Sequence, residues 1–216
     1  MRVVSLFSGA GGLDFGFIKA GHQILWANDL YRDAVETYQK NIGNHIVCED
    51  ISKISTSDIP DCDIVIGGFP CQGFSVANTK RHVDDERNVL YKQLLRVIRD
   101  KNPKFFLAEN VKGILSIGKG KVFQMILDDF QSIGYNVQYR VLNAADYGVP
   151  QTRLRVIIVG VRKDVHFEYK YPSPTNSKDG ANGLPRWVSV SDALKDIPDP
   201  DLPNNLPNHN YSKYKL

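Results

Sequence analysis

The sequence predicts an α/β protein whose mostly parallel sheet carries helices on both faces. Short apolar runs alternate along the chain with segments in which apolar residues recur at helical spacing. Strands that alternate with helices in this way form βαβ units, whose sheets are covered on both faces. Ligands of such sheets bind at the carboxyl ends of the strands. The residues that end each apolar run are therefore the first candidates for a functional site.

The apolar runs define the predicted strands, which cover residues 2–7, 23–28, 45–50, 62–68, 104–111, 137–143 and 154–161. Helices are predicted over residues 12–20, 32–41, 86–102 and 120–133. The helix over residues 86–102 is the clearest, because its apolar residues fall on one side. In the first helix, Leu13, Phe17 and Ala20 share one face and are predicted to point toward the core.

The composition changes near residue 170. Residues 172–207 hold seven of the eleven prolines, and a short helical stretch at 189–197 interrupts an otherwise extended segment. We therefore expect one folded domain over residues 1–170. A proline- and asparagine-rich tail over residues 171–216 is of the kind that forms a linker or stays disordered.

The bulk composition narrows the class of protein. With 42% hydrophobic and 24% charged residues, the 216-residue chain resembles an ordinary soluble globular protein. No apolar run reaches the roughly 18 residues of a membrane helix, and no secretory signal is evident, so we expect a cytoplasmic protein without a membrane partner. The three cysteines lack C-x-x-C spacing, so we expect no metal site and take Cys48 and Cys62 as small buried apolar residues. A net charge of +3 does not by itself indicate a nucleic-acid partner.

A glycine-rich loop, FSGAGG at residues 7–12, separates the first strand from the first helix. Its glycines permit positive φ angles and a close approach of a ligand, and the helix N-terminus offers free N–H groups to an anion. Asp29 ends the second strand, where a carboxylate can accept hydrogen bonds from ribose hydroxyls. Asp50 ends the third strand and is well placed for an adenine amino group. The pattern predicts a nucleoside cofactor but does not separate NAD from S-adenosylmethionine.

Three further groups follow predicted strands. Cys71 lies in the turn GGFPCQGFS at residues 67–75, beyond the sheet edge at which the cofactor is expected. Glu109 ends another strand, where it could cap a helix or, in a cofactor cleft, transfer a proton. Gln151, Arg153 and Arg155 alternate into the last strand, and a period of two predicts that they share one face.

These motifs resemble the blocks of the DNA (cytosine-5)-methyltransferases. FSGAGG is similar to the cofactor loop, GGFPCQGFS to the block of the nucleophile, ENVKG at 109–113 to the block of the glutamate, and QTRLR at 151–155 to the QxRxR block. DERNVL at 85–90 is similar to the block that follows the catalytic loop. The blocks occur in the family's order over residues 1–162, and the resemblance implies a Rossmann-like fold that uses S-adenosylmethionine.

The resemblance also implies a mechanism on duplex DNA. Cys71 would attack C6 of a cytosine that has been flipped out of the helix, and C5 would then accept the methyl group. Glu109 would hold or protonate N3, and Arg155, with Arg153 less directly, would hydrogen-bond the base oxygen. The cofactor positions that match the family are Phe7, Gly9, Gly11, Asp29, Leu30, Asp50, Ile51, Pro70 and Leu90. The candidate contacts to DNA are Gln72, Ser75, Lys80, Arg81 and Gln151.

Two departures from the family pattern concern the cofactor. The ribose-binding acid is commonly glutamate and here is Asp29, and the next position, often bulky, is Leu30. The family normally continues into a target-recognition region and two closing blocks. We therefore expect this sequence to be one part of a split or truncated enzyme, weakly active or inactive alone, that works with a complementing subunit.

Other functions remain open at this point. The same thiol chemistry acts on tRNA cytosine, so an RNA methyltransferase is one alternative, and a cofactor-binding regulatory module without activity is another. An NAD-dependent oxidoreductase would explain the glycine loop alone. The resemblance favours a prokaryotic restriction-modification setting.

Overall fold

The structure, a computed structural model, describes residues 1–70, 89–207 and 209 of the chain. These form two compact units. Unit 1 comprises Met1–Leu142 and Leu154–Tyr171, and unit 2 comprises Asn143–Arg153 and Pro172–Leu216, apart from the residues outside the description. The segment 143–153, which precedes the last strand, thus belongs with the tail, an assignment that the sequence did not suggest.

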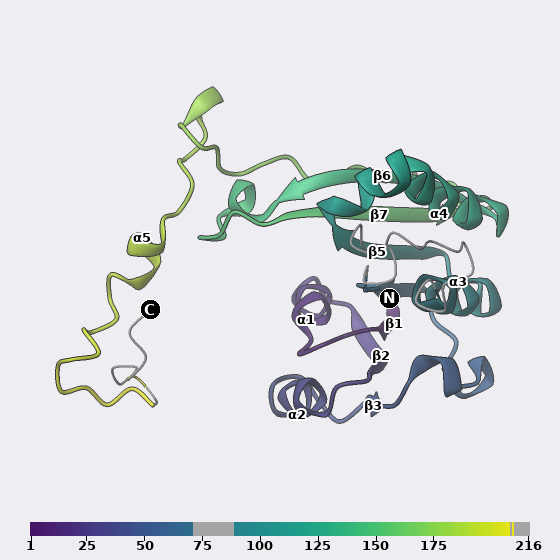
Figure 1. The fold of residues 1–216 in the computed structure, drawn as a ribbon, viewed down its shortest axis with the longest axis horizontal. Coiled ribbons are helices and arrows are strands. Elements are labelled where there is room, and N and C mark those ends of the chain that lie inside the picture. The colour runs from purple at the N-terminus through teal and green to yellow at the C-terminus, as the bar shows by residue number, and fades with distance from the viewer. Residues whose placement is uncertain (71–88, 208, 210–216) are drawn as a thin grey trace. The chain divides into compact units, whose positions relative to one another are not determined.

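Unit 1 is built on a seven-stranded sheet of order β3-β2-β1-β4-β5-β7-β6 (Figure 1). The strands are β1 (Arg2–Leu6), β2 (Gln23–Asp29), β3 (Ile46–Cys48), β4 (Ile64–Gly67), β5 (Phe105–Val111), β6 (Tyr135–Asn143) and β7 (Leu154–Arg162). The pairs β1–β2, β2–β3, β1–β4 and β4–β5 are parallel, whereas β7 runs antiparallel to β5. The predicted mostly parallel α/β sheet is confirmed.

Helices cover both faces of the sheet because successive strand residues point to opposite sides. The helices of unit 1 are α1 (Gly12–Lys19), α2 (Arg32–Asn41), α3 (Val89–Lys101) and α4 (Lys121–Ser132). Val4 and Val65 pack with the residues of α3 and α4. Their neighbours Val3 and Ile64 pack with α1 and α2 on the other side (Figure 1). The core is therefore two apolar layers separated by the sheet.

The inward face of α1 differs from the prediction. Leu13 and Phe17 pack against the core as expected, but they are only partly buried, and Ala20 is exposed. The buried residue of α1 is Asp14, whose exposed fraction is 0%. Apolar periodicity could not indicate this position, because it assigns a carboxylate to the solvent side.

Unit 2 contains short elements only: the 3-10 turns η6 (Ala144–Tyr147) and η7 (Ala181–Gly183) and the helix α5 (Val190–Leu194). The segment after Pro172 folds around Asp146, whose carbonyl oxygen accepts hydrogen bonds from the N–H groups of Thr175 and Asn176 at 2.9 and 3.0 Å. The indole Nε1 of Trp187 donates to the carboxylate of Asp146 at 2.9 Å. This part of the tail therefore has a specific fold.

Across the described ranges, every helix is too short or too polar to cross a membrane.

The two described cysteines differ in burial. Cys62 is buried, as predicted, but Cys48 is exposed, so that prediction is wrong for Cys48. The reason is position in the sheet: Cys48 ends the short edge strand β3, whose burial is confined to Ile46. Burial, followed by the negative charge of Asp63, raises the pKa of the Cys62 thiol to about 12.

We therefore expect Cys62 to resist alkylation of the folded chain at pH 8. Its raised pKa leaves roughly a thousandfold less thiolate than its usual value of 9.0 would give, and the thiolate is the nucleophile. Iodoacetamide labelling followed by peptide mapping should find Cys48 modified and Cys62 intact, with both modified in 6 M guanidinium. Equal labelling of Cys62 in the folded chain would contradict the burial.

Candidate active site

The carboxyl ends of β1, β2, β4 and β5 lie at one edge of the sheet, because these strands are parallel neighbours. This edge carries the glycine loop after β1, Asp29 at the end of β2, the turn after β4 and Glu109 on β5. The sequence elements expected in one site are thus brought together from four strands.

The glycine loop turns through left-handed backbone conformations. Phe7, Gly9 and Gly11 have φ angles of 54°, 57° and 89°. A Cβ atom on Gly11 would lie 2.2 Å from Cδ1 of Ile42 and 2.8 Å from Cδ2 of Tyr38, so only glycine fits. At Gly9 a Cβ would meet no atom of the described residues within 4 Å, so this part of the loop is open toward the rest of the described chain. The loop is thus closely packed at Gly11, against Tyr38 and Ile42, and open at Gly9.

Asp29 fixes this loop directly. Its carboxylate is 8% exposed and accepts hydrogen bonds from the backbone N–H of Gly9 at 2.7 Å and of Tyr31 at 2.9 Å. Each oxygen keeps a second lone pair for a further donor. The next residue, Leu30, is 57% exposed and offers an apolar surface beside this carboxylate.

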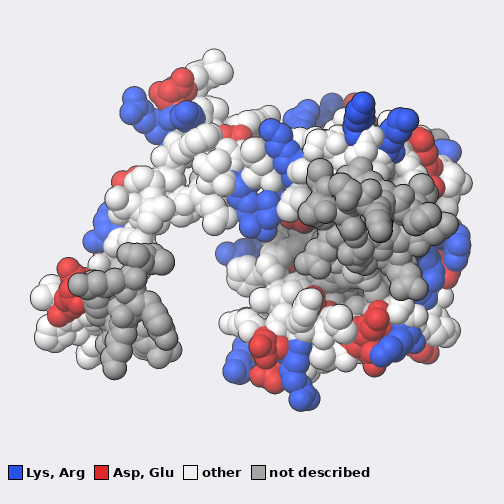
Figure 2. Space-filling view, in the orientation of Figure 1, with Lys and Arg blue, Asp and Glu red and all other residues white. Residues whose placement is uncertain are grey.

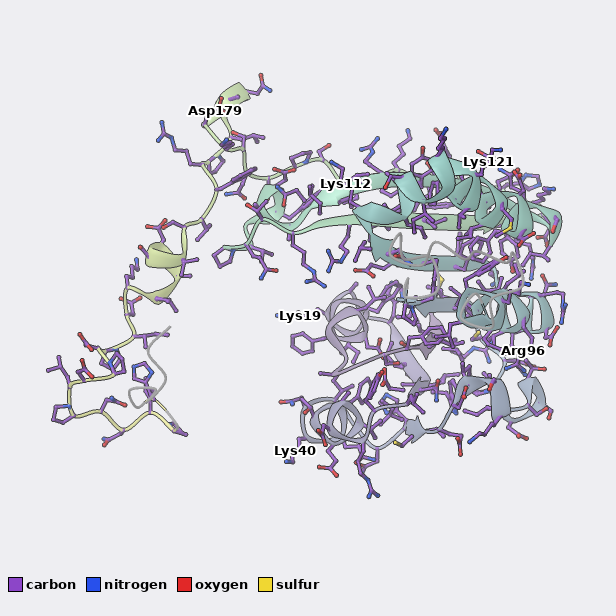
Figure 3. The ribbon with its side chains drawn as sticks, in the orientation of Figure 1. Lys19, Lys40, Arg96, Lys112, Lys121 and Asp179 are labelled. Atoms are coloured by element: carbon purple, nitrogen blue, oxygen red, sulfur yellow. The ribbon has the colours of Figure 1, made fainter. Side chains whose placement is uncertain are left out.

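Asp50 and Ile51 lie at the turn η1 (Ile51–Lys53). The Asp50 carboxylate accepts a hydrogen bond from Ser52 N–H at 2.8 Å, which holds the pKa of Asp50 below its usual value. Ile51 is buried in the core. Arg96 of α3 donates to the carbonyl oxygens of Ile51 and Ile54 at 2.8 and 3.0 Å, and Figure 3 shows it between α3 and these turns. Sequence reasoning missed Arg96, because a helix periodicity treats it as a solvated residue.

Glu109 and Arg155 form an ion pair. Arg155 Nε lies 2.6 Å from Glu109 Oε1, and the two side chains are 23% and 26% exposed. The atoms are near enough to attract as charges, but Nε is not aligned as a hydrogen-bond donor to the carboxylate. Arg155 also donates from Nη1 to its neighbour's carbonyl, that of Leu154, at 2.9 Å. A carboxylate and a guanidinium thus share one partly exposed place at the sheet edge.

The turn after β4 lies against Glu109. A Cβ on Gly68 would approach Glu109 Oε2 to 3.4 Å, so the backbone at Gly68 borders the carboxylate. The buried side chain of Asn110 donates from Nδ2 to the carbonyl oxygen of Phe69 at 2.9 Å, and its Oδ1 accepts from Val111 N–H at 2.8 Å. Asn110 therefore ties the strand of Glu109 to the turn that leads to Cys71.

Five of the predicted site residues lie outside the part of the chain that the structure describes. They are Cys71, Gln72, Ser75, Lys80 and Arg81. Pro70 and Leu90, which border that segment, are half-buried.

Of Gln151, Arg153 and Arg155, which the sequence predicts to share one face, only Arg155 lies in a strand. The strand β7 begins at Leu154, so alternation applies to Arg155 alone. Gln151 and Arg153 are exposed residues of unit 2, where Arg153 N–H donates to Asn143 Oδ1 at 3.0 Å.

Charge is distributed unevenly on unit 1. Figure 2 shows lysine and arginine side chains along the border formed by α4, and mixed charges near α2 and β3. Lys112 and Lys121, labelled in Figure 3, are exposed at this border. The basic groups are thus not confined to the candidate site.

The sequence model of the family described as C-5 cytosine-specific DNA methylase matches residues 1–216. The chain belongs to this family. Among curated relatives, the Type II methyltransferase M.NgoFVII of Neisseria gonorrhoeae is 49% identical over 95% of this chain and 55% of its own length. M.BsuRI of Bacillus subtilis, also a Type II methyltransferase, is 41% identical over 91% of this chain and 51% of its own length.

Solved structures agree with the fold of a methylase. A protein of an E. coli prophage, described as a candidate DNA modification methyltransferase, superposes with a TM-score of 0.73 at 31% identity, over 92% of this chain and 56% of that one. S. pombe Dnmt2 methyltransferase shares the fold alone, with a TM-score of 0.62 at 24% identity, over 79% of this chain and 51% of its own. The chain spans about half the length of the curated relatives it matches.

We expect the ion pair of this methylase to contribute little to stability. Glu109→Gln and Arg155→Gln should each lower the free energy of unfolding by no more than about 1 kcal/mol, because no aligned hydrogen bond joins the two groups and both side chains keep some contact with solvent. Urea unfolding followed by circular dichroism measures this. A loss above about 3 kcal/mol would instead indicate a buried, structural pair.

Asn110 should matter more to the stability of the methylase fold. Asn110→Ala leaves the Phe69 carbonyl and the Val111 N–H without their buried partner, so we expect a loss of about 1–3 kcal/mol. Asn110→Asp keeps the acceptor for Val111 N–H but sets a buried carboxylate against the Phe69 carbonyl oxygen, so it should lose at least as much stability. An Asn110→Ala chain as stable as the wild type in urea would show that this bond does not hold the turn.

Proposed function

We propose that this chain forms the catalytic part of an enzyme that transfers a methyl group from S-adenosylmethionine to C5 of cytosine in duplex DNA. The observation that carries the proposal is the Glu109–Arg155 ion pair beside Gly68, three residues before Cys71 in the chain. Type II methyltransferases among the relatives favour DNA as the substrate and a bacterial restriction-modification system as the setting. We place the activity in a prokaryotic cytoplasm on the same ground.

The residues at the sheet edge suit the proposed cofactor. Gly9 is open toward the rest of the described chain, as a loop that receives a ligand must be. The N-terminus of α1 has no side-chain cap at Gly11 within the described sequence, so its first N–H groups suit the cofactor carboxylate. We assign the ribose to Asp29, the adenine to Leu30, Asp50 and Ile51, and the remaining contacts to Phe7, Pro70 and Leu90. When bound, the cofactor supplies an electrophilic methyl group.

Cys71 acts as the nucleophile in the proposed reaction. Its thiolate forms a bond from Sγ to C6 of cytosine, and the electron pair of the C5–C6 double bond moves into the ring, where C5 becomes nucleophilic. C5 takes the methyl group and leaves the cofactor as S-adenosylhomocysteine. The C5 proton then passes to water, and the electron pair of its C–H bond restores the C5–C6 double bond and expels the Cys71 thiolate. Because these atoms are stacked inside duplex DNA, the cytosine must leave the helix, at a cost of a few kcal/mol.

Glu109 and Arg155 stabilise the charge that attack pushes into the base. Glu109 holds or protonates N3, and the guanidinium of Arg155 donates to the base oxygen. Their ion pair keeps both groups at one place before the base arrives. Arg153 and Gln151 are assigned to the same substrate, and Gln72, Ser75, Lys80 and Arg81 to the DNA.

The decisive experiment measures labelled methyl transfer from S-adenosylmethionine to unmethylated duplex DNA. Because the chain spans about half of its relatives, the assay is run alone and with the C-terminal half of a relative, which tests the predicted complementing subunit. We expect transfer with that half, none with Cys71→Ser, and a loss of about 10²–10⁴-fold with Glu109→Gln, the range for a general acid–base group.

Each other outcome selects a different function. Transfer by the chain alone would remove the need for a complementing part. Transfer to tRNA in preference to DNA would identify an RNA methyltransferase. Cofactor binding without transfer under either condition would indicate a regulatory module, and binding of NADH in place of S-adenosylmethionine would indicate an oxidoreductase.

A further inference from the structure

A chain of hydrogen-bonded polar side chains lies beneath the glycine loop. It consists of Ser8, Ser5, Asp14, Tyr38 and His45, which we call the Asp14 network. Ser8 Oγ lies 2.8 Å from Ser5 Oγ, and Ser5 Oγ donates to Asp14 Oδ1 at 2.7 Å. Tyr38 donates its hydroxyl to Asp14 Oδ2 at 2.8 Å, and His45 Nε2 lies 3.1 Å from the same hydroxyl.

The proton positions in the network follow from the number of donors. Each hydroxyl has one proton, and those of Ser5 and Tyr38 are given to Asp14. Ser8 must therefore donate to Ser5, and His45 must carry its proton on Nε2 and donate to Tyr38. Ser5 and Tyr38 thus donate directly to the carboxylate, and Ser8 and His45 donate to these two hydroxyls, so Asp14 is the final acceptor of the network.

Burial opposes the charge of this carboxylate, and the network offsets the effect. Burial raises the pKa of Asp14, whereas the hydrogen bonds from Ser5 and Tyr38 and the charge of His45 lower it. Burial and the nearby Asp14 also raise the pKa of Tyr38, so its hydroxyl stays protonated and remains a donor. A fully buried carboxylate is costly to retain. An apolar residue at position 14 would avoid this cost, so the carboxylate is expected to have a role in the structure.

The network contacts the loop at two points. Ser8 is itself a loop residue, and its hydroxyl also lies 3.3 Å from the Ser5 carbonyl oxygen, a second acceptor that shares the same proton. The ring of Tyr38 fills the space directly below Gly11. The same loop holds Phe7 in a left-handed conformation, which is strained for a residue other than glycine and persists only where its surroundings fix it.

We propose that the Asp14 network is a positioning device for the cofactor: it holds the glycine loop in its binding conformation before S-adenosylmethionine arrives. This inference rests on the proposed function for the identity of the cofactor. A loop that is already ordered loses little further freedom on binding, which strengthens affinity. If the competent fraction of the loop falls to about one tenth, the apparent Kd rises about tenfold. Asp14 and Tyr38 are positioning residues and do not take part in the chemistry.

Tyr38→Phe tests the inference, and Tyr135→Phe is its matched control. Both tyrosines are 0% exposed in unit 1, and each hydroxyl makes a buried hydrogen bond, that of Tyr135 to the Pro103 carbonyl at 2.7 Å. Tyr135 begins β6, at the other edge of the sheet from the loop. Both variants should lose stability, but only one of them should affect the loop.

Two readouts are needed. Calorimetry with S-adenosylmethionine should give a Kd about tenfold higher for Tyr38→Phe and an unchanged Kd for Tyr135→Phe. Amide hydrogen exchange without ligand should be faster over residues 7–12 in Tyr38→Phe alone. In the complemented enzyme, KM for the cofactor should rise while kcat at saturation is retained. If Tyr38→Phe does not fold, Ser8→Ala, at a half-buried residue, should give the same two changes more weakly.

The exchange measurement separates this inference from the proposed function. Unchanged loop exchange in Tyr38→Phe, or an equal change in Tyr135→Phe, would overturn the positioning role whatever ligand binds. Faster loop exchange in Tyr38→Phe, together with no binding of S-adenosylmethionine by the wild type, would support the positioning of the loop and overturn the cofactor assignment.

Discussion

The in-register pairing of β4 with β5 is the constraint on which the candidate site depends. Gly67 pairs with Ala108, so the residues that follow each, Gly68 and Glu109, emerge side by side at the carboxyl edge of the sheet. A shift of one residue would turn Glu109 to the opposite face of the sheet. Asn110, which bonds to the Phe69 carbonyl, secures the same alignment with a side chain. Register, more than any single contact, determines which groups share the site.

The reversed direction of β7 supplies the positive charge. A parallel strand would bring its last residues to the carboxyl edge, whereas an antiparallel strand brings its first. Arg155, the second residue of β7, therefore pairs with Val111 and reaches Glu109 diagonally, two residues along β5. The carboxyl ends of the parallel strands and the beginning of one antiparallel strand together assemble a site from blocks that lie far apart in the sequence.

Sequence reasoning found the fold because apolar periodicity reports what is buried. It predicted α2 at residues 32–41 with the bounds that the structure has, and it found each strand of the sheet. It gave no indication that Asp14 is buried, and it was wrong in assigning Cys48 to the core. It placed the start of β7 at residue 154, as the structure has it, although the alternation of Gln151, Arg153 and Arg155 begins before the strand does. Apolar periodicity carries no information about strand direction or about side-chain networks. It therefore could not predict the ion pair of Glu109 with Arg155, and only the order of the motifs assigned both residues to one site.

Two carboxylates hold the glycine loop in its strained conformation at the carboxyl edge of the sheet. Asp29 holds the loop from β2 through the N–H of Gly9, and Asp14 holds it from α1 through Ser5 and Ser8. Left-handed backbone and a buried carboxylate each cost stability by themselves. The two costs offset each other. The carboxylates accept the hydrogen bonds that fix the loop backbone, and the backbone N–H groups and hydroxyls are the donors that a buried carboxylate requires. Departures from ordinary burial of this kind concentrate at functional sites, and here the departure lies beneath the loop to which we assign the cofactor.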